Sequence, residues 1–383
     1  MMKIVIAPDS WKESLSALQV ASAIEAGFRE IFPTAEYVKL PLADGGEGTV
    51  EAMVAATNGR IINLDVTGPL GEPVAAFYGV SGDERCAFIE MAAASGLERV
   101  PSSRRDPWVT TSYGTGELIR DALDNGVKHF IIGIGGSATN DGGAGMVQAL
   151  GARLLNARGE ALGFGGGALL DLAHIDISAL DARIKHCRFE VACDVTNPLT
   201  GEEGASAIFG PQKGATPERV KQLDAALAHY ACVIQRDLGI DVLTIPGGGA
   251  AGGMGAALHA FCQADLRRGI EIVTDALGLD ALVKEATWVI TGEGRIDSQT
   301  LQGKVPVGVA KVAKRYHKPV IGIAGSLSND VAVVHQHGLD AVFSVVSRVC
   351  SLEEALEQAA ENLRMTARNV AATLAMGLAE SHQ

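Results

Sequence analysis

Short apolar segments alternate with helical patterns at the start of this chain. Residues 3–8 form a mostly apolar run, and residues 14–31 then repeat apolar residues at helical spacing. A second strand at 37–42 leads through a glycine-rich turn into a second predicted helix at 50–57. Two strands that each precede a helix favour a parallel sheet, because a parallel pair of strands needs a long crossover connection.

The same alternation returns near the other end of the chain. Three further strands are predicted at 288–291, 320–324 and 341–345, with helices at 305–316 and 352–378. If these strands share one sheet with the first two, the fold class is α/β, with a doubly wound parallel sheet.

The long middle region is then an inserted domain. We predict one discontinuous domain of residues 1–65 and 267–383, interrupted by a mixed α/β domain of residues 66–266. Apolar segments inside the inserted domain predict strands at 74–80, 86–91, 130–134 and 189–195.

Composition excludes several classes of protein. With 47% hydrophobic and 20% charged residues, the chain is globular rather than disordered or fibrous. No apolar run approaches the roughly 18 residues of a membrane span, and Asp9 interrupts the region where a secretory signal would still be apolar. We therefore expect a soluble, cytoplasmic protein without a membrane partner.

The balance of charge bears on the ligands of the chain. Its 32 Lys+Arg and 45 Asp+Glu give a net charge of −13, and aromatic residues are few, so nucleic acid is not an expected partner. An anionic substrate would need local cations. The six cysteines show neither zinc-ligand spacing nor a disulfide framework and are predicted to be reduced core thiols.

Polar motifs follow four of the predicted strands of the first domain. They are APDSWK, LADGGEGT, TGEGRIDSQ and AGS. Ligands of open parallel sheets bind at the carboxyl ends of the strands, so these motifs are candidates for a binding site. The alternative is that turns attract glycine and aspartate wherever they occur.

The segment from Gly133 to Gly145, GIGGSATNDGGAG, is a candidate phosphate loop. It follows an apolar strand and precedes a helix, and clustered glycines let backbone N–H groups approach a phosphate closely. The segment also matches the dinucleotide pattern GxGxxA, but the acidic residue expected at the end of a second strand is missing, since Glu160 lies in a loop-like stretch. A structural hinge is the other interpretation.

Several carboxylates and cations lie beside these motifs. The carboxylates are Asp9, Asp44, Glu47, Asp141, Asp194, Glu293 and Asp297, and the cations are Lys12, Lys213, Lys304 and Arg295. Such carboxylates can hold Mg²⁺ or accept a hydroxyl proton, and phosphoryl transfer needs cations near the transferred group. A helix cap, an Asx turn or a solvated lysine is the alternative for each residue taken alone.

The order of the motifs resembles the glycerate kinase family of the bacterial type. The motifs are APDSWKESLSA, LPLADGGEGTVEAM, GIGGSATNDGGAGM, CDVTNPLTG, FGPQKGA and TGEGRIDSQTLQGKVP. The resemblance runs from Lys3 into the last helix. One departure is SWKES at Ser10 to Ser14, where the family pattern has SFKGS; Lys12 is retained.

The resemblance implies a flavodoxin-like domain interrupted by a second α/β domain. It also implies ATP-dependent, magnesium-assisted phosphorylation of D-glycerate in the breakdown of glyoxylate, glucarate and galactarate. The 2-hydroxyl is the expected acceptor, which would give 2-phosphoglycerate, and this regiochemistry rests on the resemblance alone. The 3-hydroxyl remains an alternative, as does a homo-oligomer.

These expectations give each candidate residue a role. Asp194 would accept the substrate proton, while Lys12 and Lys213 would offset charge on the transferred phosphoryl group. The predicted ATP-binding residues are Gly133, Gly135, Gly136, Ser137, Thr139, Asn140, Asp141 and Gly142. The predicted glycerate-binding residues are Asp9, Ser10, Asp44, Arg295 and Asn197, and the predicted Mg²⁺ ligands are Glu293, Asp297 and Asp44.

Two other classes of protein stay open at this point. A nicotinamide-dependent reductase of small hydroxy acids would use the GIGGSA segment, and a two-lobed small-acid binding protein would need no catalytic groups.

Overall fold

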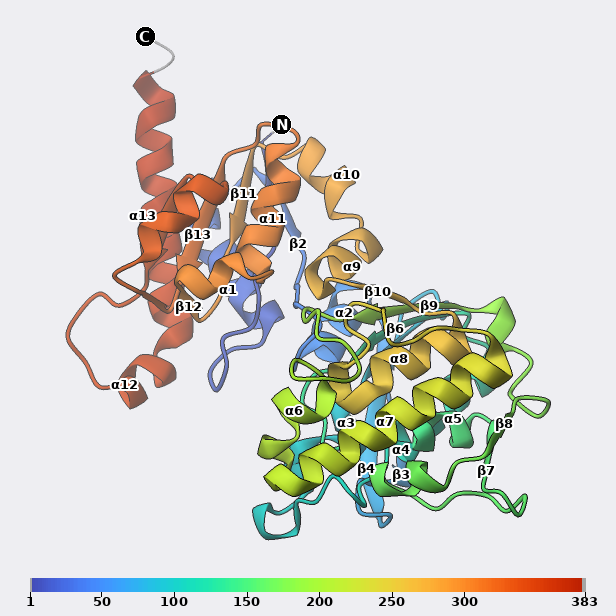
Figure 1. Cartoon of the computed structure of the whole chain (residues 1–383). Coiled ribbons are helices and arrows are strands. Elements are labelled where there is room, and N and C mark those ends of the chain that lie inside the picture. The colour runs from blue at the N-terminus through green and yellow to red at the C-terminus, as the bar shows by residue number, and fades with distance from the viewer. Residues whose placement is uncertain (1, 381–383) are drawn as a thin grey trace. The chain divides into compact units, whose positions relative to one another are not determined.

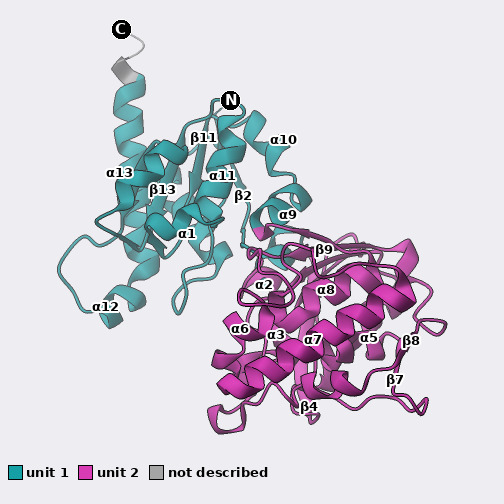
Figure 2. Ribbon diagram, in the orientation of Figure 1, with its two compact units in different colours: residues 1–44, 51–58, 270–383 teal, residues 45–50, 59–269 magenta. Residues whose placement is uncertain are grey.

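A computed structural model describes residues 2–380 (Figure 1); residues 1 and 381–383 of the first predicted domain lie outside the described part. The chain divides into two compact units (Figure 2). Unit 1 comprises residues 1–44, 51–58 and 270–383, and unit 2 comprises residues 45–50 and 59–269.

Unit 1 contains a five-stranded parallel sheet with the order β2-β1-β11-β13-β15. The strands are β1 (Lys3–Ile6), β2 (Glu36–Lys39), β11 (Trp288–Thr291), β13 (Val320–Ala324) and β15 (Ala341–Ser344). In chain order within the unit this is 2-1-3-4-5, the flavodoxin-like arrangement of a doubly wound sheet. The predicted fold class and all five predicted strands are confirmed.

Alternating residues of these strands face one layer of helices. Ile4, Ile6, Ile290 and Ile323 share a hydrophobic cluster with residues of α1 (Ala17–Arg29) and α13 (Ala359–Glu380), as the two-residue period of a strand requires. The two helices also pack on each other (Figure 1). Their close approach needs Gly27, where an added Cβ would lie 2.3 Å from the carbonyl oxygen of Arg364.

The remaining helices of unit 1 lie between and after the strands. They are α2 (Thr49–Ala56, with its first two residues in unit 2), α9 (Gly269–Ala276, with Gly269 in unit 2), α10 (Leu279–Lys284), α11 (Val305–Lys314) and α12 (Leu352–Glu357). The predicted helix over 352–378 is therefore interrupted. Gln358 ends α12 with φ −94° and ψ 8° before α13 begins.

Unit 2 contains a mixed six-stranded sheet with the order β10-β9-β6-β5-β4-β3. Its strands are β3 (Arg60–Thr67), β4 (Pro73–Val80), β5 (Cys86–Glu90), β6 (His129–Gly133), β9 (Arg188–Ala192) and β10 (Asp265–Arg267). The strands from β10 to β5 are parallel, whereas β4 pairs antiparallel with both neighbours. The predicted boundary between residues 65 and 66 falls inside β3, which belongs entirely to unit 2.

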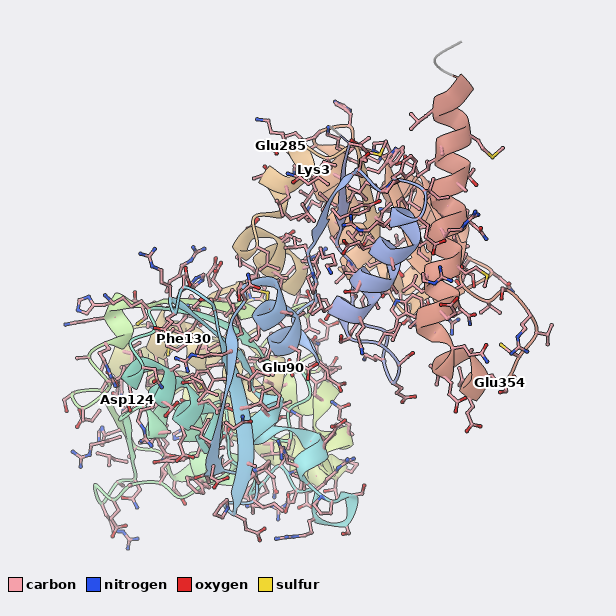
Figure 3. All side chains as sticks on the ribbon, turned by 180° about the vertical axis from the view of Figure 1, so that it is seen from behind. Lys3, Glu90, Asp124, Phe130, Glu285 and Glu354 are labelled. Carbon is pink, nitrogen blue, oxygen red and sulfur yellow. The ribbon has the colours of Figure 1, made fainter. Side chains whose placement is uncertain are left out.

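Unit 2 also contains helices and a small two-stranded antiparallel sheet. The helices are α3 (Ala92–Ser95), α4 (Tyr113–Asp124), α5 (Ala144–Ala149), α6 (Ala205–Phe209), α7 (Pro217–Leu238) and α8 (Ala250–Cys262), and the small sheet pairs β7 (Arg153–Leu155) with β8 (His174–Asp176). In the core, Phe130 (labelled in Figure 3) stacks on its cross-strand neighbour Phe189, with ring centroids 4.5 Å apart.

The cysteines and the helices bear on two expectations from composition. All six cysteines are free, and Cys232 is exposed, so it is not the core thiol that was predicted. Within residues 2–380, none of the helices combines the length and the apolar character that crossing a membrane would require.

Candidate functional site

Strand order reverses between β1 and β11 of unit 1, and ligands of doubly wound sheets bind at this point. Asp9 follows β1 and Glu293 follows β11. The two strand ends are tied together, because the backbone N–H of Asp9 donates to the carbonyl of Gly292 at 2.9 Å. The carboxylates of Asp9 and Glu293 thus belong to the region of unit 1 where the fold favours a ligand.

Asp9 is a half-buried carboxylate. Its Oδ1 accepts a hydrogen bond from the backbone N–H of Ser10 at 2.7 Å. Burial raises the pKa of Asp9 to about 7, and the nearby carboxylate of Asp44 is the second cause of this shift. Asp9 and Ser10, both predicted substrate residues, therefore lie together at the switch point.

Two further groups belong to this cluster. Asp44 Oδ2 forms an ion pair with Lys304 Nζ at 2.7 Å, and Lys304 is the residue that precedes the first turn of α11. Glu293 is 9% exposed and accepts a hydrogen bond from Thr300 Oγ1 at 2.5 Å. Burial raises the pKa of Glu293 to about 7, although the hydrogen bond from Thr300 opposes the shift.

Asp297 and Arg295 have local structural partners. Asp297 Oδ1 accepts from the backbone N–H of Gln299 at 2.8 Å and caps the 3₁₀ helix Ser298–Leu301. Arg295 Nε lies 3.3 Å from Asp297 Oδ2. The helix-cap interpretation, which the sequence left open, thus describes the observed contacts of Asp297. Lys12, the predicted cation after β1, is exposed.

The glycine-rich segment of unit 2 divides into an exposed and a buried part. Gly135 and Gly136 are exposed just beyond β6, and residues 137–142 are buried. Gly133 serves packing, because an added Cβ would lie 2.3 Å from the carbonyl oxygen of Gly45. Only the tip at Gly135 and Gly136 is open to solvent, whereas we expected the whole segment to be available to phosphates.

Asp141 holds the buried part in place. Its carboxylate accepts hydrogen bonds from the backbone N–H groups of Ser112, Gly143 and Gly145 and from the Ser112 hydroxyl, at 2.8–3.2 Å. Ser112 Oγ in turn accepts from the N–H of Met146. The N–H groups that α5 would offer an anion are therefore already satisfied within the protein, which corrects the expected binding of phosphate at this helix start.

Lys213 is also directed at this segment. It is 2% exposed, and its Nζ donates to Ser137 Oγ and to the carbonyl of Thr139, both at 2.7 Å. Burial lowers the pKa of the Lys213 ammonium to about 7. Lys213 was predicted to offset charge on the transferred phosphoryl group, with a solvated lysine as the alternative. The solvated alternative is wrong, since Lys213 is buried and both hydrogen bonds go to the loop.

Asp194 and Asn197 follow β9 in the same unit. Asp194 is exposed, and its Oδ1 accepts from the backbone N–H of Gly269 at 3.2 Å. Asn197 Nδ2 donates to the carbonyl of Glu203 at 2.8 Å. Because β9 is the parallel neighbour of β6, Asp194 and the tip at Gly135 and Gly136 both follow carboxyl ends of adjacent strands.

Sequence reasoning missed a second glycine-rich segment, PGGGAAGGMG at residues 246–255. It packs against the first one: the N–H of Gly142 donates to the carbonyl of Gly252 at 2.9 Å. Its six glycines were a signal that the sequence offered. The partners Ser112 and Thr300 carried no such signal, because a single hydroxyl residue does not reveal which carboxylate it meets.

Known proteins match both the sequence and the structure of this chain. The sequence profile of the glycerate kinase family matches residues 4–375. The chain belongs to the glycerate kinase family. It is 66% identical over 377 residues to the glycerate 2-kinase of Escherichia coli (strain K12), covering 98% of this chain and 99% of that protein.

Other members of the glycerate kinase family agree over the same length. The glycerate kinase of Bacillus subtilis (strain 168) is 60% identical over 97% of this chain and 98% of its own. A crystal structure from Salmonella typhimurium LT2, assigned as glycerate kinase 2, matches with a TM-score of 0.92 and 71% identity over 99% of both chains.

Membership of the glycerate kinase family makes this chain a kinase, which implies ATP as the phosphoryl donor. The interpretations as a nicotinamide-dependent reductase and as a binding protein without catalysis were wrong. The GxGxxA match at Gly133 therefore does not indicate a dinucleotide-dependent reductase.

Proposed function

We propose that this kinase transfers the γ-phosphoryl group of ATP to the 2-hydroxyl of D-glycerate, giving 2-phosphoglycerate and ADP. The observation that carries the proposal is the 66% identity, over nearly the full length of both chains, to the Escherichia coli protein named glycerate 2-kinase. The expected physiological setting is the breakdown of glyoxylate, glucarate and galactarate in the cytoplasm.

The carboxylate cluster of unit 1 supports a role for Mg²⁺. Mg²⁺ prefers oxygen ligands and usually takes one or two carboxylates together with substrate phosphates. In the described residues, no three His, Cys, Asp or Glu side chains converge as a metal cage made by protein alone would need. Asp44 and Glu293 fit the usual arrangement, because their oxygens are hard donors at the switch point; Asp297 fits less well, since it caps a helix.

Bound Mg²⁺ would offset negative charge on the ATP phosphates. The cations of this chain would offset negative charge on the anionic substrates, which the net charge of −13 otherwise repels. Lys304 beside Asp44, together with Lys12 and Arg295, supplies positive charge among the polar motifs of unit 1. Asp9 and Ser10 would hydrogen-bond hydroxyl groups of glycerate.

We assign proton transfer and phosphate contacts to unit 2. Asp194 would accept the proton of the attacking hydroxyl, and its exposure at the end of β9 leaves it accessible to a substrate. The N–H groups at Gly135 and Gly136 would contact phosphate oxygens. Lys213 and Asp141 would act through the loop, whose backbone they hold.

An enolase-coupled assay tests the proposal. Enolase dehydrates 2-phosphoglycerate directly to phosphoenolpyruvate, whereas the 3-ester first needs a mutase. We expect ultraviolet absorbance to rise with kinase, MgATP, D-glycerate and enolase alone. A rise only after addition of the mutase would assign the 3-hydroxyl, and no rise with either enzyme set would exclude glycerate as the acceptor.

A further inference from the structure

The second glycine-rich segment has an unusual backbone. Ala251, Gly252 and Gly253 lie consecutively in the left-handed region, with φ of 53°, 65° and 96°, at the start of α8. Left-handed backbone is costly for a residue with a Cβ, and such strain persists only where surrounding contacts hold it. Ala251 is buried in unit 2, so its surroundings impose the kink.

The kink interlocks with the candidate phosphate loop. A Cβ on Gly252 would lie 2.0 Å from the carbonyl oxygen of Thr139, and a Cβ on Gly253 would lie 2.8 Å from the Cα of Gly142. With the hydrogen bond from Gly142 N–H to Gly252 oxygen, the two backbones are in direct contact. No side chain separates them, so a shift of one segment must move the other.

The same segment also contacts the chain that follows β9. The N–H of Gly249 donates to the carbonyl of Asn197 at 3.0 Å. A Cβ on Gly249 would lie 2.1 Å from the carbonyl oxygen of Pro198. The segment thus touches both chain stretches to which we assigned catalytic contacts in unit 2: the glycine-rich loop after β6 and the residues after β9.

We propose that residues 247–255 are a positioning element of the kinase reaction. This segment holds the loop after β6 and the residues after β9 in a fixed position relative to each other. The inference rests on the proposed function of these two stretches. It explains the glycines at Gly249, Gly252 and Gly253, where a Cβ would push a backbone partner away. A misplacement near 1 Å at a reacting group costs about 100-fold in rate.

Two substitutions on one side of the segment test the contact with the loop. Gly252→Ala places a Cβ against Thr139, and Gly253→Ala does the same more mildly against Gly142. Gly151→Ala is the matched control, because Gly151 has φ 102° and a Cβ there would lie 2.2 Å from the carbonyl oxygen of Ala179, away from both stretches. Thermal unfolding measures the structural cost of each variant.

Kinetics and binding then separate positioning from stability. We expect Gly252→Ala and Gly253→Ala to raise KM for ATP about tenfold or more, and Gly249→Ala to lower kcat with a smaller change in KM for ATP. Gly151→Ala should change neither by more than about twofold despite a similar loss of thermal stability. If Gly252→Ala does not fold, the milder Gly253→Ala decides.

Equal kinetic effects in Gly253→Ala and Gly151→Ala would overturn the proposal, since the segment would then be packing alone. Calorimetric binding of MgATP to the same variants keeps the test independent of the acceptor. If the wild-type protein binds MgATP but does not phosphorylate glycerate, the proposed function fails. Weaker nucleotide binding by Gly253→Ala than by Gly151→Ala would still support the positioning role.

Discussion

Asp194 is the side chain on which the proposed proton transfer depends. It is exposed after β9, with one oxygen accepting from Gly269 N–H. General base catalysis contributes about 10²–10⁴-fold, so Asp194→Asn should lower kcat by about 100-fold or more and leave KM for glycerate little changed. Steady-state kinetics measures both. Asp265→Asn is the control, because Asp265 is an exposed carboxylate on the neighbouring strand β10. Similar kcat values for the two variants would remove Asp194 from the mechanism.

Asp9 makes stability depend on pH in a defined direction. Its pKa in the folded protein is about 7, above the ordinary value near 4, so the native state keeps a proton that the unfolded chain loses between these values. The free energy of unfolding therefore falls as pH rises through this window. Asn does not titrate, so Asp9→Asn should exceed the wild type in stability at about pH 8, with a smaller difference at about pH 5.

Urea unfolding at several pH values in EDTA measures this difference. EDTA removes divalent cations, which would otherwise favour the charged form of Asp9. Glu293, whose pKa is also about 7, titrates in both proteins. Because the Asp9 carboxylate is one cause of that raised pKa, Asp9→Asn should also lower the pKa of Glu293, which adds to the gain in stability at high pH. A difference that does not vary with pH would contradict the raised pKa.

Glu13 occupies a backbone position suited to glycine. Its φ is 62°, and it stands where the family pattern SFKGS has Gly. Replacing a left-handed non-glycine residue relieves steric cost but adds entropy to the unfolded chain, so Glu13→Gly should stabilise unit 1 by about 0.5–1 kcal/mol. Glu13→Gln keeps the Cβ and should change stability little. Denaturant midpoints measure both, and equal shifts would assign the effect to charge instead.

The loop after β6 depends on the hydrogen bonds of Asp141. Burial raises the pKa of this carboxyl group, and the N–H donors that surround it oppose the shift. Asp141→Asn would turn an amide NH₂ toward these donors, and we expect a loss of about 2–4 kcal/mol in the free energy of unfolding. Ser112→Ala should cost less, about 1–3 kcal/mol. Urea unfolding measures both losses.

An exposed carboxylate in the same unit provides the comparison for Asp141. Asp124 (labelled in Figure 3) pairs only at the surface with Arg183, and Asp124→Asn should change stability by no more than about 1 kcal/mol. A similarly small change in Asp141→Asn would show that its four hydrogen bonds do not hold the loop.

Strands that form apolar runs could be predicted from the sequence, whereas the edge strand β3, which alternates with polar residues, could not. KIVI, WVIT and VIGIA are nearly continuous apolar runs, as is typical of strands in a parallel sheet with helices on both faces. The strand β3, RIINLDVT, lies at the edge of its sheet and alternates with polar residues, so it lacked this signal. The predicted domain boundary between residues 65 and 66 therefore cuts this strand.

The candidate site was predictable in its residue types but not in its contacts. The sequence placed Asp9 and Glu293 after buried strands, and the fold brings those strands together. It could not show that Asp141 and Lys213 are buried, because burial depends on α4, α7 and α8 packing from distant parts of the chain. The left-handed backbone at Ala251 likewise lies where the segment contacts distant parts of the chain, which a local sequence pattern does not reveal.

Each of the two units carries polar groups at the same end of its parallel strands. Each has parallel strands whose carboxyl ends carry polar groups: carboxylates and Lys304 in unit 1, and a glycine-rich tip with Asp194 in unit 2. Glu90, at the carboxyl end of β5, accepts a hydrogen bond from Val50 N–H and joins residues 45–50 to unit 2 (Figure 3).

Phosphorus NMR of the purified protein with ATP, Mg²⁺ and D-glycerate tests the central claim most directly. Chemical shift and proton coupling distinguish a phosphate on the secondary 2-hydroxyl from one on the primary 3-hydroxyl. The 2-ester should couple to one proton and the 3-ester to two. We predict the appearance of 2-phosphoglycerate together with ADP. Formation of the 3-ester, or ATP left unchanged beside folded protein, would contradict this account of the kinase.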